Sequence, residues 1–75
     1  MKYIRLANKA TLILFPDWLS HKDAAADRQV SSAGFVNTET WECYGESASL
    51  GVTSHPQSDT RILKGMLNIK AAEAA

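Results

Sequence analysis

The sequence has a single cysteine, Cys43, and only two histidines, His21 and His55. One cysteine cannot form a disulfide within the chain, and a lone thiol is more typical of a reducing compartment than of secretion. These three side chains lie far apart, without the ligand spacing of a structural zinc site. The sequence therefore predicts no internal disulfide, no metal site and no bound cofactor.

The chain also lacks net charge and long apolar runs. Its 8 lysines and arginines balance 8 aspartates and glutamates. Proteins that grip nucleic acid through its phosphates usually carry a basic excess, so the balance argues against nucleic acid as a partner. The apolar run at residues 11–15 is shorter than a signal peptide core, which needs roughly 7–15 residues, or a membrane span of about 20. We therefore expect a cytoplasmic protein that does not enter a membrane.

With 75 residues, the chain has room for one domain. A domain this small buries only about 60% of the surface that its unfolded chain exposes, so its stability is modest. Disulfides and zinc are not available as added support, which leaves self-association, and we expect a homodimer. We place a single compact α+β domain at residues 1–70 and interpret residues 71–75 as a helix extension or a frayed tail.

Two strands should open the chain. Residues 3–7 alternate apolar and polar side chains, which indicates a half-buried strand. Asn8 and Lys9 can close a tight hairpin because asparagine tolerates a positive φ. The run at residues 11–15, which Pro16 ends, is nearly all apolar and suggests a strand that is covered on both faces or one that lies in a dimer.

A helix of two to three turns should follow within residues 17–28, where three alanines favour helix. Ser20 with Asp23 three places later resembles a capping box, and Asp17 offers an alternative cap one turn earlier. Residues 30–36 are small and tolerate β structure, so we expect a third strand there.

Glycines should shape the strands of the second half. Gly34 lies inside the third strand and predicts a bulge or a close backbone approach. Residues 41–52 alternate over an unusually long stretch, which Gly45 and Gly51 should kink or split in two.

The last helix should begin near Ser54, which forms a capping-box pattern with Gln57. Its apolar residues recur at helical spacing: Ile62, Leu63, Met66, Leu67 and Ile69. Gly65 inside this helix suggests a close contact. The order β-β-α-β-β-α predicts an α+β fold, with an antiparallel sheet of about four strands and two helices on one face.

Cys43 is the one candidate nucleophile. A catalytic cysteine needs a depressed pKa and a nearby base, and either His55 or His21 could supply the base. However, Cys43 shares a strand face with Trp41, which is typical of a packed thiol. We therefore expect Cys43 to be buried, both histidines to be exposed residues at helix starts, and the protein to be non-catalytic.

The aromatic side chains exceed what so short a fold must hide, and tyrosine and tryptophan dominate interface hot spots. We expect Trp18 and Tyr44 to be exposed, and Tyr3 and Arg5 to share the outer face of the first strand. The candidate contact residues are Trp18, Tyr44, Tyr3, Arg5 and Trp41. The leading hypothesis is a self-associating protein-interaction module, whose partner is another protein or a second copy. One alternative is a small nucleic-acid-binding or regulatory module, in which a sheet face that carries Tyr3, Arg5 and Tyr44 stacks single-stranded bases. The other is a cysteine-dependent enzyme.

Overall fold

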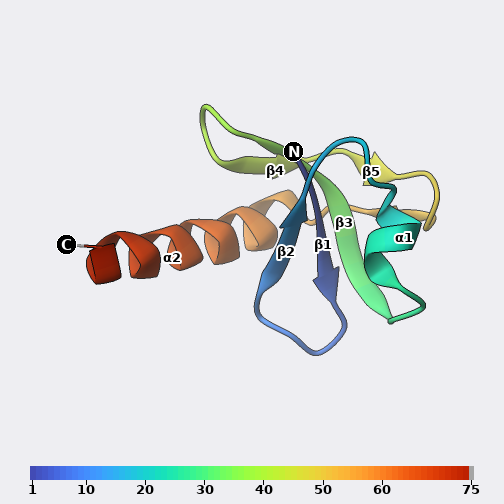
Figure 1. Cartoon of the computed structure of the whole chain (residues 1–75), viewed down its shortest axis with the longest axis horizontal. Helices are drawn as coiled ribbons and strands as arrows, with labels where there is room; N and C mark the ends of the chain where they lie inside the picture. The colour runs from blue at the N-terminus through green and yellow to red at the C-terminus, as the bar shows by residue number, and fades with distance from the viewer. Residues whose placement is uncertain (75) are drawn as a thin grey trace.

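The computed structural model describes the backbone of residues 1–74 and the side chains of residues 1–68. The elements in chain order are β1 (Lys2–Leu6), β2 (Leu12–Phe15), α1 (His21–Ala25), β3 (Val30–Asn37), β4 (Glu42–Tyr44), β5 (Glu46–Ser47), β6 (Val52–Thr53) and α2 (Pro56–Ala74). Four strands form an antiparallel sheet in the order β2-β1-β3-β4 (Figure 1). β5 pairs with β6 in a separate hairpin. The predicted α+β class and the four-stranded antiparallel sheet are confirmed.

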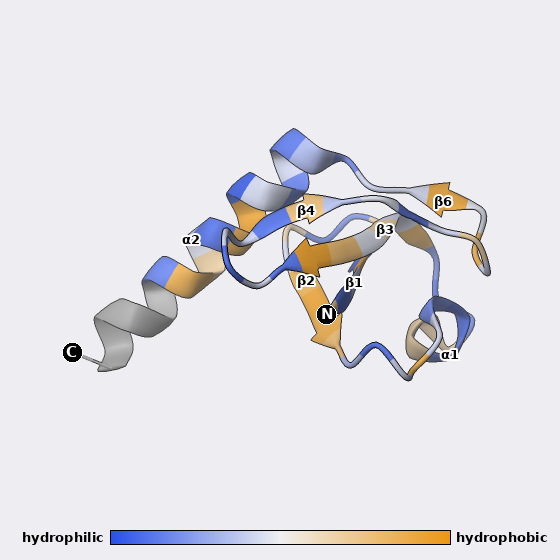
Figure 2. Cartoon of the chain, turned by 90° about the horizontal axis from the view of Figure 1, so that it is seen from above, coloured by the Kyte–Doolittle hydropathy of each residue, from blue (hydrophilic) through white to orange (hydrophobic). Residues whose placement is uncertain are grey.

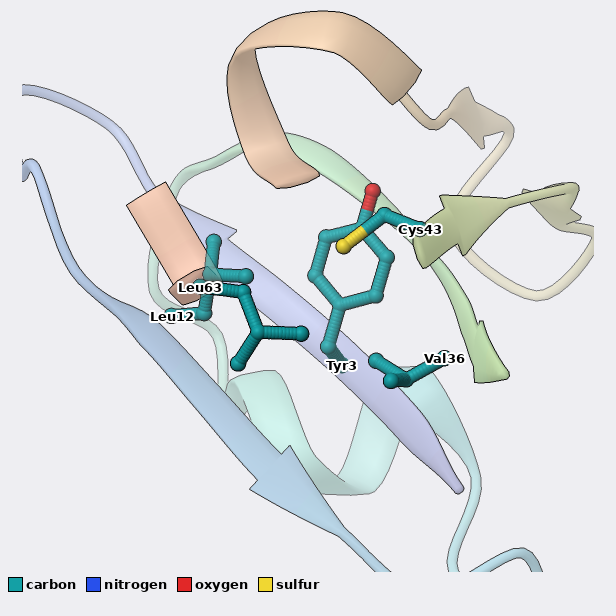
Figure 3. Close-up of a cluster of buried hydrophobic side chains, with 5 residues drawn as sticks. All are labelled: Tyr3, Leu12, Val36, Cys43 and Leu63. Atoms are coloured by element: carbon teal, nitrogen blue, oxygen red, sulfur yellow. The ribbon is translucent and has the colours of Figure 1, made fainter. Parts of the chain in front are cut away.

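β1 lies in the middle of the sheet and has no polar face. Tyr3 and Ile4 are both fully buried, although successive side chains of a strand point to opposite faces. Tyr3 packs in a cluster with Leu63 of α2 (Figure 3), and Ile4 packs in a second cluster with Ala25 of α1. The two helices therefore cover opposite faces of the sheet (Figure 2), and the prediction that both lie on one face is wrong.

The prediction is wrong because Tyr3, which the alternating pattern places on the outer face of the strand, is buried. Its ring is apolar, and its hydroxyl can be buried when it finds a hydrogen-bond partner. Tyr3 meets that condition, as described below, so both faces of β1 need a cover and each helix supplies one.

α1 is shorter than expected and spans 5 residues, His21–Ala25. The Ser20 cap is confirmed, because its Oγ accepts the Asp23 N–H at 3.0 Å. The helix ends where Ala26 adopts a φ of 50°, in the left-handed region, so the alanine run does not extend it. Residues 17–20 form a turn before the Ser20 cap, so the alternative cap at Asp17 is not used.

α2 begins at Pro56, two residues after the predicted capping serine. The backbone N–H of Ser54 donates to Gly45 O at 3.0 Å, which keeps this residue in the preceding loop. The N–H of His55 instead donates to the Asp59 carboxylate at 3.0 Å. In place of the predicted Ser54–Gln57 capping box, the carboxylate of Asp59, one turn into the helix, accepts the His55 N–H.

Three glycines explain how the chain runs from β3 to β6. A Cβ on Gly34 would collide with the carbonyl oxygen of Tyr44, which confirms the predicted close approach between β3 and β4. Gly45 and Gly51 have φ values of 81° and 65°, and the long alternating stretch is split at both. A Cβ on Gly65 would meet no atom of the described residues within 4 Å beyond its own stretch of helix, so the predicted close contact in α2 is wrong.

Replacing two of these glycines with alanine should have opposite effects. Gly34→Ala should destabilise the protein by about 2 kcal/mol or more, because β4 must move away from the new methyl group. Gly65→Ala should stabilise it by about 0.5–1 kcal/mol, because alanine favours helix and nothing lies in its way. Urea denaturation of both variants checks this; a stable Gly34→Ala protein would contradict the tight β3–β4 contact.

Candidate interaction surface

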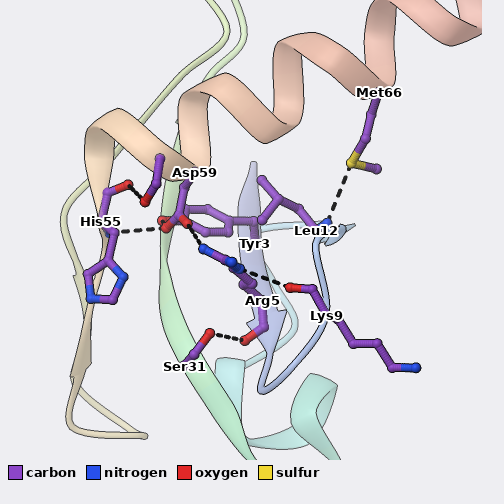
Figure 4. A network of polar contacts seen from close by, with 9 residues as sticks. Tyr3, Arg5, Lys9, Leu12, Ser31, His55, Asp59 and Met66 are labelled. Carbon is purple, nitrogen blue, oxygen red and sulfur yellow. Dashed lines mark hydrogen bonds and ion pairs between the residues drawn. The ribbon is translucent and has the colours of Figure 1, made fainter.

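A buried carboxylate joins α2 to the central strand. Asp59 lies in the first turns of α2 and is fully buried. Its Oδ2 accepts the Tyr3 hydroxyl at 2.5 Å and the His55 N–H at 3.0 Å, and its Oδ1 lies 3.5 Å from Arg5 Nη1 (Figure 4). Burial raises the pKa of the Tyr3 phenol, and the hydrogen bond to Asp59 raises it further. The phenol therefore stays protonated and keeps donating.

This network removes two of the predicted contact residues from the surface. Tyr3 is fully buried and Arg5 is half-buried beside Asp59, so neither presents a free outer face. Tyr44 stacks on Phe35, with ring centroids 5.9 Å apart. Phe35 contacts the α1 side of the sheet, away from Tyr3. The base-stacking surface that the sequence suggested is therefore not assembled.

Cys43 is a packed thiol. Its side chain is buried in the same cluster as Tyr3, and its backbone N–H donates to Thr60 Oγ1 at 2.9 Å. Burial raises the pKa of the thiol to about 11, which disfavours the reactive thiolate.

Neither histidine forms a pair with Cys43. His21 is buried against the other face of the sheet, where its Nε2 lies 2.8 Å from Gly34 O and its ring stands edge-on to Phe15 and Phe35. The expectation that His21 is exposed is wrong, because these rings and this carbonyl enclose it. His55 is exposed at the start of α2, as expected. The structure thus assembles no cysteine–histidine pair.

The remaining aromatic candidates differ in exposure. Trp18 is 82% exposed and Tyr44 is 52% exposed, as expected for both. Trp18 stands in a turn directly after β2, closed by the Leu19 N–H donating to Pro16 O at 3.2 Å. Trp41 is half-buried and packs against the cluster that contains Tyr3.

The hydrogen-bond register shows which backbone groups of β2 face outward. The Val36 N–H donates to Met1 O, so alternate residues of β1, beginning with Met1, bond to β3 and the residues between them bond to β2. Lys2 and Ile4 therefore bond to their partners Phe15 and Ile13. It follows that Leu12 and Leu14, which alternate with these partners, point their N–H and C=O groups away from the sheet.

α2 closes some of the outward N–H groups along the two outer edges of the sheet and leaves the Leu14 backbone open. On β4, the Thr60 hydroxyl accepts the outward N–H of Cys43. On β2, Met66 Sδ accepts the outward N–H of Leu12 at 3.4 Å, and Leu12 is only 4% exposed. Within the described residues, no group outside the β1–β2 ladder bonds the Leu14 backbone. Pro16, the next outward position, has no N–H, and its C=O accepts from Leu19.

A shallow hollow of about 470 Å³ adjoins this open position. It is largely apolar and lies at the end of β2 that leads into the Pro16 turn. The residues that line it are Met1, Leu14, Phe15, Pro16, Asp17 and Thr38. The open backbone of Leu14 and this hollow together form one continuous surface, which we call the β2 edge.

Two further classes of site have no counterpart in the described part of the chain. No group of three or more histidine, cysteine, aspartate or glutamate side chains there could hold a metal ion. Among the described residues, no helix is both long and apolar enough to cross a membrane.

The Tyr3–Asp59 contact can be tested with a matched pair of tyrosines. Tyr3→Phe should lower the free energy of unfolding by about 2 kcal/mol, because the buried carboxylate loses a donor. Tyr44→Phe removes the same hydroxyl from an exposed ring and should change it by less than about 0.5 kcal/mol. Urea denaturation at neutral pH compares them; equal effects would show that the contact does not stabilise the fold.

The Cys43 thiol should resist alkylation in the folded protein. With a pKa of about 11, almost none of it is thiolate at pH 8, and the side chain is buried. Iodoacetamide should therefore react at the rate at which the protein opens, and urea should accelerate the reaction sharply. Mass spectrometry follows the labelling. Rapid labelling without urea would restore Cys43 as a candidate nucleophile.

No model of a known protein family, no curated protein and no solved structure matches this chain.

Proposed function

We propose that the protein is a small, non-catalytic interaction module that binds a second copy of itself through the β2 edge. The observation that carries this proposal is the Leu14 backbone, whose N–H and C=O both point away from the sheet with no partner in the described part of the chain. A strand that offers such groups is a template for another strand.

The side chains of β2 support pairing rather than solvent exposure. The strand reads Leu-Ile-Leu-Phe and carries no charge. Edge strands that stay single are normally protected by lysine, proline, a bulge or a covering loop. Here α2 covers Leu12 and proline protects position 16, but Leu14 between them has none of these protections.

A second copy fits this edge because the strand can pair with itself. In antiparallel pairing, each copy donates the Leu14 N–H to the other copy's Leu14 C=O, so both open groups of both copies are satisfied together. An uncharged edge also avoids repulsion between two identical surfaces. The added burial stabilises a domain whose own core is small. A reducing, cytoplasmic setting is part of the proposal, supported by the single cysteine.

The two alternative functions lack their key residues at the surface. A cysteine-dependent enzyme needs an accessible thiol beside a base, and Cys43 is buried with a raised pKa. A base-stacking surface needs Tyr3, which is buried under α2. Self-association through the β2 edge is the function that the geometry supports best.

Self-association should depend on protein concentration and on Leu14. Sedimentation velocity between about 5 and 500 µM should show a monomer–dimer equilibrium. Leu14→Lys adds a charge at the open position and should leave a monomer. Thr53→Lys adds the same charge on the exposed face of the β5–β6 hairpin and should not change the equilibrium.

Two controls keep this test decisive. Circular dichroism and thermal unfolding show whether Leu14→Lys still folds. If it does not fold, a synthetic chain with an N-methyl group on the Leu14 amide removes the outward donor and preserves the side chain. A wild-type protein that stays monomeric over the whole range contradicts the proposed function, as does a dimer that survives a folded edge variant.

A further inference from the structure

The position of Leu14 between two closed neighbours defines how two copies would meet. Leu12 has its N–H on Met66 and is almost fully covered, so its amide is not free to donate to a second strand. Pro16 has no N–H, and its C=O is used in its own turn. Among the described residues of β2, Leu14 is thus the position whose outward N–H and C=O are both open.

α2 provides a second constraint, because it is longer than the sheet is wide. Its 19 residues span about 28 Å at 1.5 Å per residue, whereas four strands spaced by about 4.8 Å span roughly 15 Å. Met66 already reaches the outermost strand at Leu12, and α2 continues past β2 to Ala74 (Figure 1). Leu67, the first residue after Met66, is an apolar side chain that remains half-exposed.

Building on the proposed function, we infer that β2 pairs antiparallel with β2 of the second copy about a two-fold axis at Leu14, and that α2 beyond Met66 occupies the hollow of the other copy. Residues at equal distances from Leu14 then face one another. Leu12 of one copy therefore faces Pro16 of the other.

This axis brings the helix of one copy to the hollow of the other. Met66 marks the level at which α2 passes over β2, which is the level of Leu12. Because Leu12 of one copy faces Pro16 of the other, the two-fold axis places α2 of the first copy beside Pro16 of the second. Pro16 is one of the residues that line the hollow. The axis also places both α2 helices on the same face of an eight-stranded sheet. Each copy thus offers both the part of α2 that begins at the half-exposed Leu67 and the recess that receives it.

Single cysteines on β2 test the axis directly. In a Cys43→Ala background, Leu14→Cys places two cysteines in a hydrogen-bonded pair with Cα atoms about 5.5 Å apart, which a disulfide can bridge. Ile13→Cys is the matched control, because its Cα atoms would lie about 8 Å apart, beyond the reach of a disulfide. Diamide supplies the oxidant, accepting the two electrons and two protons of the paired thiols.

Each result of the cross-linking decides a different point. A disulfide dimer of Leu14→Cys alone supports the axis. A disulfide dimer of Ile13→Cys alone overturns the axis at Leu14 and leaves the proposed pairing of β2 intact. A non-covalent dimer in which neither variant cross-links overturns the pairing itself. Monomers throughout, by sedimentation, overturn the proposed function.

The helix-in-hollow contact has its own test on the β3–β4 turn. Thr38→Arg places a long charged side chain in the hollow and should weaken the dimer at least about tenfold, or 1.4 kcal/mol. Thr40→Arg lies on the same turn, is exposed and does not line the hollow, so it should change the dissociation constant by less than about twofold. Equal effects of the two variants would overturn this part of the inference.

Discussion

One buried carboxylate, that of Asp59, determines how α2 lies on the sheet. It accepts hydrogen bonds from the Tyr3 hydroxyl of β1 and from the His55 amide just before α2, and it forms an ion pair with the Arg5 guanidinium. A buried charge without such partners costs several kcal/mol, so α2 is stable only where these donors converge. The position of α2 then decides which backbone groups along the two outer strands are closed and which stay open.

The two helices cover both faces of the central strand, so within the described residues the open backbone groups of the sheet lie at its edge. α1 and α2 cover opposite faces of the sheet, and the aromatic and aliphatic residues of both faces are largely enclosed. At one edge of the sheet, a threonine of α2 accepts an outward N–H of β4. At the other edge, a methionine of α2 accepts an outward N–H of β2. The surface proposed for a second copy is therefore the stretch of β2 whose outward backbone groups α2 does not cover.

Local patterns in the sequence predict the elements but not their spatial relations. The first strand, the Ser20 cap and the breaks at Gly45 and Gly51 each depend on neighbours in the chain, and all are present in the structure. The burial of Tyr3 depends on a carboxylate 56 residues away, and the closing of β2 depends on a thioether 54 residues away. The apolar run at residues 11–15 suggested a covered or dimeric strand, but only the folded register shows which of its amides are open.

The same long connections have a consequence for biosynthesis. β1 is made before the other strands and helices described and lies inside the sheet, whereas the carboxylate that accepts from its tyrosine belongs to α2, which is made much later. Native contacts between residues so distant in sequence slow folding, because a large loop must close before they form. A nascent chain that ends before α2 leaves Tyr3 and its apolar neighbours uncovered, and such intermediates are the species that chaperones recognise.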